Sequence, residues 1–235
     1  MERNLLKSQK NGTGEEEEKK NSGKKPIGDD ESKEKEKVQS EIEPKTGLSF
    51  PVKLDDGQQL NAVGVRKKSM LGISIKVYGF GMYADNARLK DVLESKFGKA
   101  PAKPTEEMYR LVIDSDAGMQ VRLVIVFSQL TMSMVRKNFD EGLGASIKKL
   151  TGAKNGELAK KVMGEASDDI KLTSGSAVEI SRLPGYILQT KVMGEVVSKV
   201  ESELLCRAYV NMYLGDDPLD KEAKDRFGMS LISLF

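Results

Sequence analysis

The sequence predicts an α+β fold, in which a mostly antiparallel sheet is covered on one face by helices. Residues 59–65 and 75–83 alternate side chains with the two-residue period of a strand. Residues 132–150 instead repeat apolar side chains every three or four positions, which is the period of an amphipathic helix. Strands, a helix, more strands and more helices follow one another without an internal repeat, and this order is typical of the α+β class.

The first two strands are expected to be neighbours in the sheet. The second strand carries two glycines, Gly79 and Gly81, on one face. Because glycine has no side chain, this face predicts the close approach of a packed helix or a ligand. Asp85 or Asn86 is expected to cap the helix that follows.

The middle and the end of the chain continue this alternation. The run 123–127 is apolar on both faces, which predicts a central strand covered on both sides. The expected elements, in chain order, are a helix ending near residue 96, strands over 109–114 and 120–130, helices over 132–150 and 155–163, a strand over 177–182, a hairpin of 186–192 with 195–197, a helix from a capping box at 198–201 to residue 213, and a last helix from 217 to 228.

Two regions of different composition divide the chain. Residues 1–45 are rich in glutamate and lysine and contain almost no large apolar side chain after Leu6, so we expect a disordered charged segment. Residues 46–235 are expected to form one folded domain with a single core. The N-terminal segment lacks the apolar stretch of a secretory signal and the acid-poor composition of a transit peptide, which favours the cytosol.

Composition excludes several classes of function. The formal charge is +2 without a massed basic region, so no nucleic-acid partner is expected. The chain has no histidine, which excludes a Ser-His-Asp triad and a histidine-ligated metal, and we expect neither a metal nor a cofactor. No apolar run is long enough for a membrane span. The single cysteine, Cys206, lies in an apolar run and is expected to be a buried small side chain.

Arg66 and Tyr78 are the most informative polar side chains. They lie twelve positions apart on two apolar segments that we expect to form neighbouring strands. An arginine that faces an apolar interior requires an anion, and its planar fork suits a carboxylate to which a phenol can also donate. The pair therefore predicts a container for an acid with a long apolar tail. The competing interpretation is a surface arginine in the basic run 66–68 and a core tyrosine with its hydroxyl at the surface.

The chain resembles the chalcone-isomerase fold, and is most similar to its plant branch without isomerase activity, the chalcone isomerase-like fatty-acid-binding proteins. The segments that carry the resemblance are EPKTGLSFP (43–51), GVRKK (64–68), VYGFGMY (77–83), SMVRKNF (133–139) and LLCRA (204–208). The resemblance implies an open-faced β-sandwich with a ligand cleft between the sheet and the helices. It also implies that Arg66 and Tyr78 bind the carboxylate of a free fatty acid, from laurate to stearate.

The resemblance further implies a non-enzymatic role in fatty-acid biosynthesis or transport in the chloroplast stroma, and the cytosol is the alternative location. We expect no catalytic residue. The candidate cleft-lining residues are Met134, Val135 and Cys206, together with Leu143, Leu205 and Met212.

The sequence departs from true chalcone isomerase at three places. That enzyme has a threonine where Tyr78 stands, a tyrosine within the segment aligned with residues 130–134, and a small hydroxyl residue where Cys206 stands; the arginine alone is retained. Two alternatives stay open: a chalcone or related isomerase, and a non-catalytic partner protein of flavonoid enzymes.

Overall fold

The computed structural model describes residues 39–235 apart from residues 71, 154, 165 and 169. The predicted disorder of residues 1–38 lies outside the described residues. Residues 40–42 form a strand, so ordered structure begins before the predicted domain boundary at residue 46. Every helix in the described part is too short or too polar to cross a membrane.

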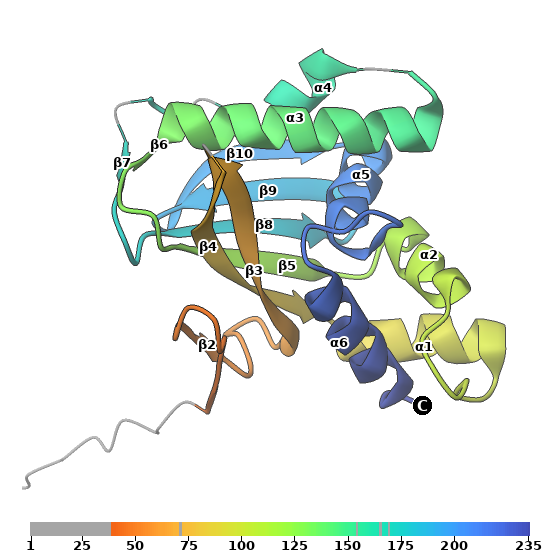
Figure 1. The fold of residues 1–235 in the computed structure, drawn as a ribbon. Helices are drawn as coiled ribbons and strands as arrows, with labels where there is room; N and C mark the ends of the chain where they lie inside the picture. Colours follow the sequence, from red (N-terminus) through yellow and green to blue (C-terminus); the bar gives the residue numbers. More distant parts are fainter. Residues whose placement is uncertain (1–38, 71, 154, 165, 169) are drawn as a thin grey trace, which may run out of the picture. The chain divides into compact units, whose positions relative to one another are not determined.

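Six antiparallel strands form the main sheet, in the order β10-β9-β8-β5-β4-β3 (Figure 1). The strands are β3 (Gln59–Met70), β4 (Ile73–Ala84), β5 (Met119–Ile125), β8 (Ala177–Leu183), β9 (Ile187–Val192) and β10 (Glu195–Glu201). Two small sheets pair β1 (Ser40–Ile42) with β2 (Ser49–Pro51) and β6 (Leu130–Thr131) with β7 (Lys171–Leu172). The antiparallel sheet confirms the predicted α+β class.

Helices cover one face of this sheet, where the long helix α3 runs beside α5 (Figure 1). The helices are α1 (Asn86–Phe97), α2 (Glu106–Asp114), α3 (Met132–Thr151), α4 (Gly156–Lys160), α5 (Glu203–Leu214) and α6 (Lys221–Ile232). The core lies between the layers: Phe80, Leu123 and Val178 of the sheet are fully buried with Leu143 and Ile147 of α3. Burial of this apolar surface is the main stabilising contribution.

A turn in residues 43–50 packs against the opposite face of β4. The buried Glu43 carboxylate accepts hydrogen bonds from the Thr46 amide (2.7 Å) and hydroxyl (2.6 Å), which fixes the turn. A Cβ atom on Gly79 would lie 2.7 Å from Leu48 Cδ1, and one on Gly81 would lie 2.9 Å from Phe50 Cδ1. The close approach predicted at the two glycines is therefore made by this turn, and not by a helix or a ligand.

One predicted strand is a helix. Residues 109–114, expected to be extended, belong to α2, which begins after Thr105, whose side chain accepts a hydrogen bond from the Met108 amide (3.3 Å). Met108, Tyr109, Val112 and Ile113 are buried with helical spacing. The apolar run is as short as a strand, and the cap outside it decides the structure.

The start of α5 also differs from the prediction. Residues 198–201, which read as a capping box, belong to β10 and pair with β9. The cap is Ser202, whose hydroxyl accepts a hydrogen bond from the Leu205 amide at 3.2 Å. The hairpin itself forms as predicted, and its second strand is longer because cross-strand bonds outweigh the local capping pattern.

The remaining boundaries shift by a few residues. The strand expected over 120–130 ends at Ile125, and its second face is half-buried, so β5 is interior without being equally covered on both sides. The last helix begins after Asp220, which caps it, and continues to Ile232. The helix over 132–150 and the Asp85 cap of α1 are confirmed.

Candidate functional site

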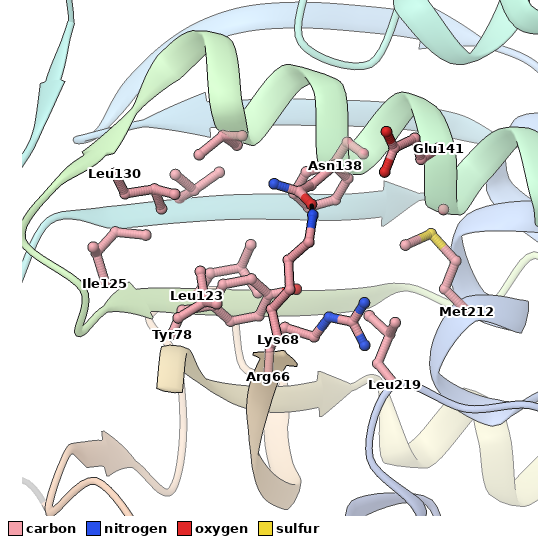
Figure 2. Close-up of a pocket in the computed structure, with 15 residues that line it drawn as sticks. Arg66, Lys68, Tyr78, Leu123, Ile125, Leu130, Asn138, Glu141, Met212 and Leu219 are labelled. Carbon is pink, nitrogen blue, oxygen red and sulfur yellow. Dashed lines mark hydrogen bonds between the residues drawn. The ribbon is translucent and has the colours of Figure 1, made fainter. Parts of the chain in front are cut away.

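A cavity of about 300 Å³ lies between the sheet and helix α3 (Figure 2). Strands β3, β4, β5 and β8 form its floor, and helices α3 and α5 form its roof and one end. Most of its wall is apolar, as in Leu123, Ile125, Leu130, Val135, Phe139 and Met212. A mostly apolar cavity with few polar groups is typical of a small-molecule site.

Arg66 and Tyr78 line this cavity side by side. The antiparallel register of β3 and β4 pairs these two residues directly. Arg66 is half-buried, and its guanidinium makes no hydrogen bond or ion pair with any other residue that the structure describes. Burial raises the pKa of the Tyr78 phenol to about 12, against the opposing effects of the Arg66 charge and the Tyr213 hydroxyl. At neutral pH the pair therefore offers a cation and a protonated donor to an anion.

An irregularity in strand pairing shapes the wall beside these residues. Arg66 pairs with Tyr78 but Lys67 pairs with Lys76, so Val77 has no partner on β3. The extra residue is a β-bulge, and it allows Val77 and Tyr78 both to line the cavity although they are adjacent in sequence. Strict alternation along a strand would place two adjacent residues on opposite faces.

Three polar residues that the sequence analysis did not single out also line the cavity. Lys68 extends from β3 to helix α3, where its Nζ donates to Asn138 Oδ1 at 2.6 Å (Figure 2). The Asn138 amide in turn donates to the Met134 carbonyl at 2.7 Å, which orients its oxygen toward Lys68. Glu141 lies one turn further along α3, on the same wall. Lys68 could have been found from its position, because it lies two residues from Arg66 on the same strand face.

The comparisons with known proteins decide the family. The chalcone isomerase-like family model matches residues 100–227. The chain is 62% identical over 197 residues to chalcone isomerase-like protein 1 of Humulus lupulus, covering 83% of this chain and 92% of that protein. The chain belongs to the chalcone isomerase-like family. Membership confirms the resemblance carried by the sequence motifs.

Two further comparisons within the chalcone isomerase-like family concern proteins named for a ligand. The chain is 36% identical over 193 residues to fatty-acid-binding protein 1 of Arabidopsis thaliana, covering 80% of this chain and 69% of that protein. The crystal structure of an Arabidopsis thaliana fatty-acid-binding protein matches with a TM-score of 0.77 and 35% identity, covering 83% of this chain and 98% of the other. This structural match confirms the predicted chalcone-isomerase fold.

Of the predicted tail-contacting residues in this family member, the structure brings two into the cavity wall, Val135 and Met212. Leu143, Leu205 and Cys206 are fully buried in the core and do not line the cavity. Met134 is exposed, because it precedes Val135 by about a quarter turn of the helix and points away from the sheet.

The structure shows the surroundings of two positions at which the sequence departs from chalcone isomerase, the start of α3 and Cys206. Thr131, in the segment that lacks a tyrosine, caps α3 and accepts a hydrogen bond from the Met134 amide at 3.2 Å. Burial raises the pKa of the Cys206 thiol to about 12, against the opposing charge of Arg182, so the thiol stays protonated. Within the described residues, no three acidic or cysteine side chains gather as metal ligands.

Proposed function

We propose that this protein binds free fatty acids without catalysis, with Arg66 and Tyr78 holding the carboxylate and the apolar cavity holding the tail. The observation that carries the proposal is the half-buried Arg66, which has no anionic partner among the described residues and lies opposite a protonated phenol in a mostly apolar cavity. The fatty-acid-binding relatives in the family support the class of ligand.

The size of the cavity bears on the length of the tail. A volume of about 300 Å³ lies at the small end of the range of roughly 300–1,000 Å³ for ligand pockets, which favours a medium chain such as laurate. Burying about ten methylenes contributes roughly 8 kcal/mol, and a charge-assisted headgroup bond adds about 1.5–3 kcal/mol. Association costs at least about 4 kcal/mol, so we expect a Kd of roughly 10–100 μM, which suits a reversible carrier.

The absence of catalysis is part of the proposal. The hydroxyl of Thr131, at the start of α3, accepts the capping hydrogen bond of that helix, and the Cys206 thiol is buried in the core. A chalcone-type isomerase is the second candidate function. It is favoured by the retained Arg66 and by the high identity to a protein named chalcone isomerase-like. Measured turnover of a chalcone above the spontaneous rate would support it.

The cellular role is proposed as fatty-acid metabolism in the chloroplast stroma, in keeping with the plant family that the sequence resembles. The test is the location of a fluorescent fusion of the full-length protein in plant cells. Fluorescence confined to the cytosol would contradict the stromal location while leaving the ligand unaffected.

The ligand itself is tested by extraction. Purified protein is incubated with laurate, separated from free lipid and extracted with organic solvent, and retained fatty acid is measured by mass spectrometry. Arg66→Ala is expected to abolish retention and Tyr78→Phe to reduce it. Arg122→Ala is the matched control, because Arg122 pairs with Glu179 (2.6 Å) away from the cavity. Absence of laurate from the unaltered protein, or full retention by Arg66→Ala, would overturn the assignment.

A further inference from the structure

Two buried phenols behind the cavity wall lack a well-formed hydrogen bond. Tyr209 and Tyr213 lie one turn apart on α5, and each side chain is 2% exposed. Neither hydroxyl makes a hydrogen bond of ordinary geometry, although the Tyr213 hydroxyl lies close enough to Tyr78 and Tyr209 to lower the pKa of both phenols against the effect of burial. A buried donor without a partner is costly, and its retention calls for an explanation.

The aromatic packing places these phenols next to the headgroup site. The ring of Phe80 contacts both Tyr78 and Tyr213. Its centroid lies 6.4 Å from the ring centroid of Tyr78 and 5.3 Å from that of Tyr213, and both pairs pack edge to face. The ring centroid of Tyr209 lies 5.5 Å from that of Tyr213. It also lies 6.5 Å from the ring centroid of Phe139, which lines the cavity. Tyr78, Tyr213 and Tyr209 thus form one cluster that reaches the cavity only at Tyr78.

The hydrogen-bonding capacity of these groups determines which hydroxyl donates and which accepts. A carboxylate only accepts, so Tyr78 must donate its single proton to the ligand. The oxygen of Tyr78 is then left as an acceptor, and the Tyr213 hydroxyl is a neighbouring donor. Burial raises the pKa of Tyr209 and Tyr213 well above the ordinary value, so both remain protonated donors at neutral pH.

We propose that Tyr213 and Tyr209 are positioning residues that polarise Tyr78 toward the ligand. In the loaded protein Tyr209 donates to Tyr213, Tyr213 donates to Tyr78, and Tyr78 donates to the carboxylate. This relay rests on the proposed fatty-acid site and extends it. Successive donors strengthen one another in a buried environment, so the relay favours an ionised acid over a neutral ester of the same chain length.

The test compares laurate with methyl laurate in competition with a fluorescent fatty-acid probe. Tyr213→Phe keeps the ring and removes only the hydroxyl. We expect it to weaken laurate binding about 3- to 10-fold, as for the loss of a hydrogen bond between two neutral groups, and methyl laurate binding by less than about 2-fold. Tyr83→Phe is the matched control, because the Tyr83 hydroxyl is also buried without a partner but does not line the cavity or join this cluster.

A double-mutant cycle separates a relay from simple packing. Once Tyr78→Phe has removed the link to the ligand, adding Tyr213→Phe is expected to cause no further loss of laurate affinity. Additive losses, or equal losses for the acid and the ester, would overturn the relay. The thermal midpoint of ligand-free Tyr213→Phe should equal or exceed that of the unaltered protein, because the hydroxyl that is removed is buried without a well-formed hydrogen bond.

The two proposals fail in different ways. If the unaltered protein does not bind laurate, the fatty-acid site and the relay are both overturned. If it binds laurate and Tyr213→Phe binds equally well, the fatty-acid site stands and the relay is overturned.

Discussion

Four arginines of the described chain are accommodated in three different ways. Arg122 pairs with a carboxylate on the sheet, and Arg207 pairs with Asp114 at 2.8 Å. Arg182 is fully buried and donates to three backbone carbonyls. Arg66 is half-buried in an apolar cavity and has no such acceptor within the described residues. A charge in this setting is stabilised only by water or by an anionic ligand.

The shape of the Arg66 side chain matters as well as its charge. Arg66→Lys keeps the positive charge but replaces a planar fork with a single ammonium, so it loses the two-point contact with a carboxylate. We expect laurate affinity to fall about 10-fold in Arg66→Lys and about 100-fold in Arg66→Met. Competition with a fluorescent fatty-acid probe measures both. Equal affinity of the lysine variant and the unaltered protein would show that charge alone is sufficient.

At the scale of elements, helix α3 carries two glycines in different surroundings. A Cβ atom on Gly142 would lie 2.8 Å from Cε of Met212, and both residues line the cavity. A Cβ atom on Gly144, two residues later, would meet nothing within 4 Å. The glycine at position 142 thus allows α3 and α5 to approach each other at the end of the cavity.

These glycines give a paired prediction. Gly144→Ala is expected to stabilise the protein by about 0.5–1 kcal/mol, because alanine is the better helix former. Gly142→Ala displaces the end of the Met212 side chain, so we expect little or no gain in stability. We also expect this variant to lose more affinity for long-chain acids than for laurate. Urea unfolding and a chain-length series of fatty acids check the two effects. Unchanged chain-length selectivity in Gly142→Ala would contradict this account of the cavity end.

Helix α2 depends on a buried cation at its C-terminal end. The Arg182 guanidinium donates to the carbonyls of Val112 and Ile113, each at 3.1 Å, and to Ala117 at 2.8 Å. Burial lowers the pKa of Arg182 to about 10, so it remains a cation at neutral pH. These bonds join the end of α2 to strand β8.

Removing this cation should be costly. We expect Arg182→Met to lower the free energy of unfolding by about 3 kcal/mol or more, because it leaves buried carbonyls without donors. Arg122→Met, which breaks a partly exposed ion pair on β5, should cost less than about 1 kcal/mol. Urea denaturation of both variants gives the comparison. Equal losses would show that the carbonyl contacts of Arg182 contribute little.

The sequence predicts the helices and strands that have a long periodic pattern. It does not predict features that depend on pairing with another strand or on a cap outside the apolar run. The twenty-residue helix α3 and the pairing of the strands that carry Arg66 and Tyr78 were predicted. The bulge beside Val77 was not, because it depends on the pairing between two strands. Helix α2 has a strand-like pattern in the sequence, because its apolar run is short and its cap lies outside that run.

At the scale of the whole described chain, several buried acidic groups stay protonated in the folded protein. Burial raises the pKa of the Cys206 thiol from its ordinary 9.0 to about 12. It also raises the pKa of Tyr78 and of Tyr109 from 10.0 to about 12. The unfolded chain releases these protons at lower pH than the folded protein does.

Stability should therefore depend on alkaline pH. Between about pH 9 and pH 12 the folded state holds more protons than the unfolded state, so the free energy of unfolding falls as pH rises. Below about pH 9 these groups are protonated in both the folded and the unfolded state, so the stability does not decline for this reason. Urea unfolding from pH 7 to pH 11 measures the decline, and Cys206→Ala should delay its onset toward pH 10. A free energy of unfolding that stays constant to pH 11 would contradict the prediction.

Strand β4 is used on both faces at once. Tyr78 faces the cavity, and the next residue, Gly79, lies against Leu48 and Thr46 of the turn on the opposite face. The backbone between them cannot move toward one side without opening a gap on the other. Substitutions in the turn and around the headgroup site should therefore covary among members of the family, although the two groups of residues lie on opposite sides of the sheet. The residues of this turn therefore evolve together with the residues of the ligand site.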